Sequence, residues 1–242
     1  MTYSIVARCG VSGEFGVAVA TYSPNVGATV PAVVSGRGAV AYQCVTSPIH
    51  RAIAVRMLAE GASAAGTLAA LSAQDPFWDM RQVTLVDMFG GVAGFTGSTA
   101  PAHAGHRLGD GFAVAGNVLT DRCLNDTWEG FMATAGSDLP LSERLMRALE
   151  AGARSGGQPE GLTSAALLVH GKESFPLLDL RVDLHDRPVI ELRRVLEFMR
   201  PLQDYYVQRK TDPTGLPRWW QKRMEVAPDW TPNHLLQVVP QQ

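Results

Sequence analysis

Strand-like and helix-like segments come in separate blocks along the sequence, and this order restricts the folds open to the chain. Alternating or β-branched residues predict strands within 3–10, 13–23, 36–46, 80–98, 109–119, 161–171 and 176–186. Apolar residues three and four apart predict helices within 48–72, 125–135, 140–157 and 187–198. Because strands follow one another in groups, with helix pairs between the groups, the pattern favours mainly antiparallel sheets covered by helices over a doubly wound parallel sheet.

Turn and cap residues place several boundaries of these segments. A turn rich in Gly and Ser joins the first two strand-like segments, and Gly90 with Gly91 divides a later one, so both stretches are predicted to be hairpins. Gly61 interrupts the first helix-like segment, and Ser63 is placed to cap the helix that follows. That segment therefore predicts two helices.

Residues 1–200 are predicted to form one domain, and residues 201–242 a C-terminal extension. The extension is rich in proline and aromatic residues and lacks sustained periodicity. Its aromatic residues are too apolar for a free tail, so we expect it to pack on the domain or on a partner subunit: Tyr205, Tyr206, Trp219, Trp220 and Trp230. This predicts a homo-oligomer, at least a dimer.

The composition excludes several classes of partner. The net charge is -2 and the basic residues are scattered, so neither nucleic acid nor an anionic membrane is an expected partner. No apolar run approaches the roughly 20 residues that cross a bilayer, and no secretion signal precedes the first strand, so we expect a cytoplasmic protein. Cys9, Cys44 and Cys123 form no C-x-x-C pair and are interpreted as buried thiols without a disulfide or zinc role. The glycine clusters lack nucleotide-binding spacing, and no cofactor or metal is predicted.

Thr2 stands directly before the first strand, where removal of Met1 would make it the N-terminal residue. An N-terminal threonine combines a nucleophilic hydroxyl with an α-amine that accepts its proton. The amine has a reference pKa of about 7.7–8.0, so part of it is a free base at neutral pH. Thr2 is therefore a candidate nucleophile, although threonine is also a common second residue.

Several ordered blocks carry a resemblance to a known family: TYSIVAR, GEFGVAVAT, VGATVPAVVSGRGAVAYQ, MRQVTLVDMFGGVAGFTGS, AGHRLGDGFAVAGNVL, TSAALLV and DLRVDLHDRPVIELRR. Together, from Thr2 to about Phe198, they resemble the bacterial family filed as domain of unknown function 1028, which is grouped with the N-terminal-nucleophile (Ntn) hydrolases. The resemblance implies an α+β fold, a four-layer αββα sandwich of two antiparallel sheets between helices. It also implies hydrolysis of an amide-type carbon–nitrogen bond, with Thr2 in the nucleophile's position.

Other residues are candidates for the same site. Asn117 ends a predicted strand before a helix, where its amide could face a developing oxyanion or simply cap the helix. Further candidates for orienting the nucleophile or lining the pocket follow the second strand or surround the third: Thr21, Tyr22, Ser23, Gln43 and His50. Thr21, Tyr22 and Ser23 could equally cap a loop.

Charged groups favour a small polar substrate. His106 and Arg181 are candidates for substrate contact, and Arg181 is alternatively expected to pair with Asp183, two residues along the same strand face. The leading hypothesis is thus a hydrolase of an amide, ureido or cyclic amide bond. One alternative is a non-catalytic protein that binds a metabolite or a partner on the same scaffold. Another is a metal-dependent hydrolase that uses His103, His106 and His185.

Overall fold

The computed structural model describes residues 2–101 and 103–228. Its six-stranded sheet has the order β10-β9-β2-β1-β8-β7, and its four-stranded sheet has the order β3-β4-β5-β6. All neighbouring strands in both sheets are antiparallel. The strands are β1 (Thr2–Arg8), β2 (Phe15–Thr21), β3 (Pro31–Val34), β4 (Gly38–Cys44), β5 (Arg81–Asp87), β6 (Val92–Thr96), β7 (Gly105–Gly109), β8 (Phe112–Asn117), β9 (Ser164–His170) and β10 (Pro176–Val182).

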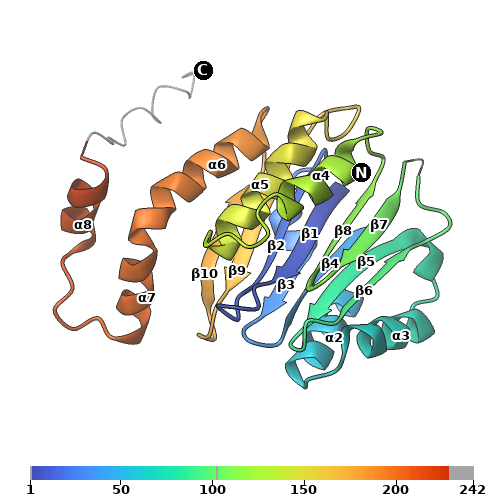
Figure 1. Cartoon of the computed structure of the whole chain (residues 1–242), viewed down its shortest axis with the longest axis horizontal. Helices are drawn as coiled ribbons and strands as arrows, with labels where there is room; N and C mark the ends of the chain where they lie inside the picture. The colour runs from blue at the N-terminus through green and yellow to red at the C-terminus, as the bar shows by residue number, and fades with distance from the viewer. Residues whose placement is uncertain (1, 102, 229–242) are drawn as a thin grey trace, which may run out of the picture. The chain divides into compact units, whose positions relative to one another are not determined.

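Helix pairs cover the outer faces of the two sheets (Figure 1). Helices α4 (Cys123–Met132) and α5 (Leu141–Arg154) pack on the six-stranded sheet, and α2 (Pro48–Ala59) and α3 (Ala64–Gln74) pack on the four-stranded one. The remaining helices are α1 (Val26–Thr29), α6 (Pro188–Met199), α7 (Gln203–Thr211) and α8 (Trp219–Val226), with 3-10 turns at Trp78–Met80 and Arg200–Leu202. The predicted four-layer αββα sandwich of the α+β class is confirmed.

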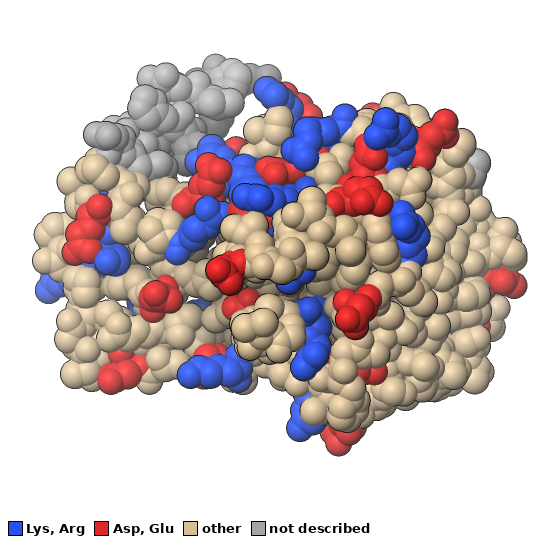
Figure 2. Space-filling model, in the orientation of Figure 1, with Lys and Arg blue, Asp and Glu red and all other residues tan. Residues whose placement is uncertain are grey.

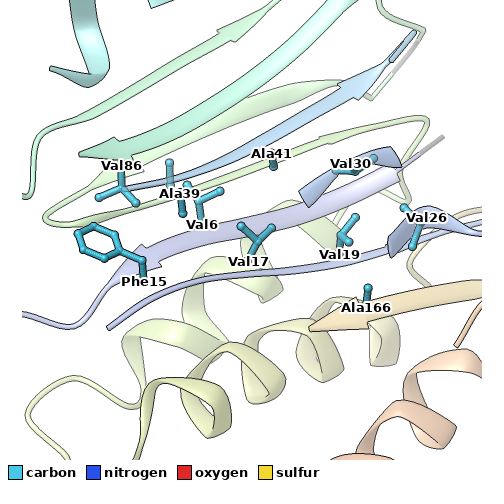
Figure 3. Close-up of a cluster of buried hydrophobic side chains, with 11 residues drawn as sticks. Val6, Phe15, Val17, Val19, Val26, Val30, Ala39, Ala41, Val86 and Ala166 are labelled. Carbon is cyan, nitrogen blue, oxygen red and sulfur yellow. The ribbon is translucent and has the colours of Figure 1, made fainter. Parts of the chain in front are cut away.

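The core between the sheets follows from the two-residue period of the strands. Side chains of β1 and β2, among them Val6, Val17 and Val19, point toward Ala39 and Val86 of the facing sheet (Figure 3). All of these side chains are fully buried. The small alanines on β4 allow the two sheets to approach closely.

The predicted hairpins and the division of residues 48–72 into two helices are confirmed, and two strands were missed. Gly61 has a φ of 85° between α2 and α3, and Ser63 Oγ accepts a hydrogen bond of 3.1 Å from the Gly66 N–H at the start of α3. The sequence patterns did not predict the short strands β3 and β7, each of which lies at an edge of its sheet. The three cysteines are free thiols, but only Cys123 is buried, so burial of Cys9 and Cys44 was wrongly expected.

The chain divides into two compact units, Met1–Arg194 and Val195–Gln242. The second unit contains helices α7 and α8, although its sequence lacks sustained periodicity. Within it, the ring centroids of Tyr206 and Trp219 lie 5.5 Å apart, and the Tyr205 hydroxyl donates a hydrogen bond of 3.1 Å to the Pro217 carbonyl. Trp230 lies outside the described residues.

The visible surface carries both signs of charge interspersed rather than gathered in one patch (Figure 2). Among the described residues, no helix has the length and apolar character needed to span a bilayer.

Candidate active site

The layer between the two sheets is apolar at one end and polar at the other. Because alternate residues of a strand share a face, the strands that supply Val6, Val19 and Val86 to the core also direct polar residues into the same layer nearer their other ends. We call five such residues, from β1, β2, β4, β5 and β8, the polar cluster: Thr2, Thr21, Gln43, Gln82 and Asn117. All five are buried. Ser4 and Thr84 lie one step further in, before the apolar core begins.

Thr2 begins the strand that pairs with β2 on one side and with β8 on the other. Its hydroxyl lies 3.2 Å from the hydroxyl of Thr21, and its partner in the ladder with β8 is Asn117. Directly opposite residues on one face of an antiparallel pair have their Cβ atoms about 4.5–5.5 Å apart. The structure therefore brings together three residues that the sequence analysis singled out.

Asn117 is joined to the four-stranded sheet through Gln82. Its Nδ2 donates a hydrogen bond of 2.9 Å to Gln82 Oε1, which also accepts one of 2.7 Å from Gln43 Nε2. No described residue makes a hydrogen bond to Asn117 Oδ1 or Gln43 Oε1. Gln43, a predicted pocket residue, thus belongs to the same cluster as Asn117.

Two of the strands that end in this cluster, β4 and β8, turn abruptly there. Cys44 follows Gln43 with a φ of 71°, and Val118 follows Asn117 with a φ of 53°. A β-branched residue in the left-handed region costs on the order of 1–3 kcal/mol, and such strain gathers at functional sites.

His106 reaches the cluster through a hydroxyl. Gln82 Nε2 donates a hydrogen bond of 2.9 Å to Thr96 Oγ1, which lies 2.9 Å from His106 Nδ1. Burial lowers the pKa of His106, which favours the neutral ring. The edge strand β7 therefore places His106 two hydrogen bonds from Gln82.

The loop between α5 and β9 closes the other side of the cluster. Gln158, buried in this loop, accepts a hydrogen bond of 2.7 Å from the Tyr22 N–H and donates one of 3.3 Å to the Asn117 carbonyl. The Ser23 carbonyl accepts a hydrogen bond of 2.6 Å from Ser164 Oγ. Tyr22 and Ser23 thus lie beside Thr21 with their backbones fixed, and the Tyr22 side chain is 42% exposed.

His50 belongs to a different group, on the helix-covered face of the four-stranded sheet. Its Nδ1 lies 2.8 Å from Ser47 Oγ and 3.3 Å from Asp75 Oδ2. In a Ser-His-Asp triad the hydroxyl and the carboxylate contact different ring nitrogens. Here both contact Nδ1, and Ser47 caps α2 by accepting from the His50 N–H, so these residues order a helix start.

Arg181 also lies apart from Thr2, on β10 at the edge of the larger sheet. It pairs with Asp179 through hydrogen bonds of 2.8 and 2.9 Å, so the expected pairing with Asp183 was wrong. Asp179 borders a cavity of about 700 Å³ whose lining includes Arg51 and His170 but no member of the polar cluster.

The histidines of the metal alternative stand in separate places. His103 pairs with Asp121 at 3.1 Å and His185 pairs with Asp186 at 3.1 Å, both near the surface, whereas His106 lies between the sheets. In the described part of the chain, no three His, Cys, Asp or Glu side chains converge as a metal site requires.

Sequence reasoning missed two members of this region, Gln82 and Gln158. Gln82 shares its strand face with Thr84 and the core residue Val86, so a polar residue at a core-facing position was the available signal. Gln158 lies in a glycine-rich loop and carried no such signal. The resulting site is made of hydroxyls and carboxamides, which position and polarise a reacting group but do not take up a proton near neutral pH.

Solved structures similar to this chain include near and distant ones. Protein SPO2555 from Silicibacter pomeroyi, described as a DUF1028 protein, is 30% identical, with a TM-score of 0.74 over 82% of this chain and 88% of that chain. Anbu (ancestral beta-subunit) from Yersinia bercovieri is 12% identical, with a TM-score of 0.41 over 89% of this chain and 99% of that chain. An Anbu mutant from Hyphomicrobium sp. strain MC1 is also 12% identical, with a TM-score of 0.42 over 90% and 100%.

None of the curated proteins matches the sequence. The model of a family of unknown function, DUF1028, matches residues 2–192, which include every strand and the helices α1 to α5. This match extends over most of the chain and agrees with the likeness to SPO2555. The chain belongs to the DUF1028 family.

Proposed function

We propose that the protein is a hydrolase of a carbon–nitrogen bond, in an amide, ureido or cyclic amide, with Thr2 as an N-terminal nucleophile. The observation that carries the proposal is the position of Thr2. It begins the strand β1 in the interior of the sheet, faces Asn117 across the ladder, and has its hydroxyl 3.2 Å from that of Thr21. Burying polar side chains without hydrogen-bond partners costs free energy, so a group of them at one end of the layer supports a site that binds a polar ligand.

The α-amine of Thr2 is the base in this proposal. The other members of the polar cluster are a hydroxyl and three carboxamides, which do not accept a proton at neutral pH. Removal of Met1 would supply an amine with a pKa of about 7.7–8.0 on the nucleophile itself. Retention of Met1 would lock that nitrogen in a peptide bond.

The reaction would follow two steps. Thr2 Oγ attacks the substrate carbonyl while its proton passes to the α-amine, and the second Nδ2 hydrogen of Asn117 donates to the oxyanion. The carbon–nitrogen bond then breaks, and the ammonium returns the proton to the departing nitrogen. Water, deprotonated by the amine, hydrolyses the ester and restores the threonine.

A small polar metabolite is the proposed substrate. Tyr22 and Ser23 are the proposed contacts nearest to the nucleophile, because they directly follow Thr21 and Tyr22 is partly exposed. His50, His106 and Arg181 stay predictions as substrate contacts, since their hydrogen-bond partners lie outside the immediate surroundings of Thr2. A cytoplasmic homo-oligomer also stays a prediction.

Intact mass and activity together test the proposal. We expect the purified native chain to lack Met1, and Thr2→Ala to abolish turnover on a panel of small amides and ureides. The matched control is Ser4→Ala, a buried hydroxyl on the same strand face that has no described hydrogen-bond partner, and it should retain turnover. A retained Met1 in an active chain would overturn the mechanism, and a retained Met1 in an inactive chain would favour a non-catalytic binding protein.

A further inference from the structure

We infer that Gln82 is a positioning residue that fixes the orientation of the Asn117 carboxamide, opposite Thr2 in the ladder. The inference rests on the proposed function, in which Asn117 is the oxyanion donor. Gln82 is fully buried on β5, in the opposite sheet from Thr2 and Asn117, and its side chain crosses the space between the sheets.

The orientation of the Gln82 carboxamide is determined by two backbone carbonyls. Nε2 lies 3.0 Å from the Gly105 carbonyl oxygen and 2.8 Å from that of Gly116, and it also donates to Thr96. A carbonyl oxygen only accepts hydrogen bonds. Reversing the carboxamide would place Oε1 against two acceptors, so Nε2 must face β7 and β8.

Gln82 then determines the orientation of its neighbours. With Nε2 facing the carbonyls, Oε1 faces Asn117 at 2.9 Å and Gln43 at 2.7 Å, and it too can only accept. Asn117 must therefore present Nδ2 to Gln82. Its Nδ2 keeps one further hydrogen, and its Oδ1 has no described partner.

This arrangement matters because an asparagine carboxamide has nearly the same shape in both orientations. In the proposed function an N–H of Asn117 donates to the oxyanion, and this requires Nδ2 in the position that Gln82 gives it. The reverse orientation would put the Oδ1 lone pairs there, and these would repel the oxyanion. Without Gln82, nothing described in the chain distinguishes the two ends of Asn117. Gln82 would thus act on the reaction through Asn117 without touching the substrate.

A covalent probe of Thr2 tests this through a double-mutant cycle. The probe is a small β-lactone, and the measured quantity is the rate of Thr2 acylation by intact mass. Loss of an oxyanion donor slows such reactions about 10²–10³-fold, so we expect Asn117→Ala to fall in this range and Gln82→Met to slow acylation at least about tenfold. The double variant should be no slower than Asn117→Ala, because the Gln82 effect passes through Asn117.

The control is Thr84→Val, which changes a buried residue on the same face of β5, two positions along, whose hydroxyl has no described partner. It should acylate at the wild-type rate. If Gln82→Met does not fold, Gln82→Ala takes its place, because it also removes the Oε1 acceptor that holds Asn117 Nδ2. Slowing that is additive in the double variant, or no slowing by either Gln82 variant, would overturn the inference.

A second measurement separates this inference from the proposed function. In the ¹⁵N spectrum of the full chain, the Asn117 side-chain amide should show a hydrogen-bonded proton protected from exchange, lost in the Gln82 variant and kept in Thr84→Val. If the exchange protection of the Asn117 side-chain amide is unchanged by the Gln82 substitution, the inference is wrong. If Thr2 is not acylated in the wild type, the nucleophile proposal fails, and the amide signals still decide the role of Gln82.

Discussion

Asp75 shows how a single buried charge stabilises the four-stranded sheet. It is 4% exposed and accepts hydrogen bonds of 2.9 Å from the Tyr42 hydroxyl and 2.8 Å from Arg81 Nε. Burial alone would raise the pKa of Asp75, but hydrogen bonds from Arg81, the Phe77 N–H and Tyr42 outweigh it and lower the pKa to about 2. The carboxylate therefore stays ionised inside the fold.

We expect Asp75→Asn to lower the free energy of unfolding by about 3–5 kcal/mol at pH 7, because it leaves Arg81 buried without its counter-charge. The folded pKa of about 2 lies below the unfolded value of about 3.9, so the stabilisation is complete above about pH 5 and is lost as pH falls toward 2. Urea unfolding from pH 7 to pH 2 should show the difference shrinking below about pH 5. The surface variant Asp121→Asn serves as control, and a difference independent of pH would contradict the assignment.

Residue chemistry alone identified part of the candidate site. Thr2, Thr21 and Asn117 could be singled out from the sequence. A hydroxyl next to the chain start suggests a nucleophile, a hydroxyl at the end of the neighbouring strand suggests a group that orients it, and an amide at a strand end suggests an oxyanion donor. The contribution of Gln82 depends on partners in both sheets, on β4, β7 and β8, and no local pattern contains that information. Histidine is a common active-site residue, but His50 lies in the first turn of α2, which packs on the opposite face of the four-stranded sheet from the polar cluster.

Helix α5 packs closely on β1 because Gly152 has no side chain and leaves room for the aromatic ring of Tyr3. A Cβ there would lie 2.7 Å from Tyr3 Cε2 and would also meet Thr127. Alanine favours a helix over glycine by about 1 kcal/mol, whereas overpacking a core costs about 1–3 kcal/mol. We expect the steric cost to dominate, since Tyr3 is fully buried and hydrogen-bonded to the Leu149 carbonyl at 2.9 Å.

Gly152→Ala should therefore lower the urea midpoint of unfolding, while Gly66→Ala in α3 should leave it unchanged or raise it. At Gly66 a Cβ would meet only Ser63 Oγ, at 3.1 Å, so the steric cost is small. The higher helix propensity of alanine should therefore decide the effect on stability. Equal midpoints for the two variants would mean that α5 does not pack on β1 as described.

The elements that the sequence predicted are those with a strong pattern of their own. The hairpin β1–β2 and helix α5 carry clear periodicity, whereas the edge strand β7, Gly105–Gly109, has no apolar alternation and is formed by pairing with β8. Tertiary pairing decides such strands. Helices α7 and α8 carry a mixture of polar and aromatic residues, which conceals helical spacing.

For the whole molecule, the open question is what the second unit contributes to assembly. Trp220 on α8 is 59% exposed and Met224, one turn further, is 47% exposed, which leaves an apolar surface of the kind that partner subunits cover.

If the chain is a homo-oligomer that associates through α8, Trp220→Glu should weaken association without unfolding the protein, because the residue is exposed in the single chain. Sedimentation velocity over a range of concentrations measures this, with Glu225→Gln, also on α8 and exposed, as the matched control. A wild-type chain that sediments as a monomer, or a Trp220→Glu chain that associates as the wild type does, would remove α8 from the proposed interface.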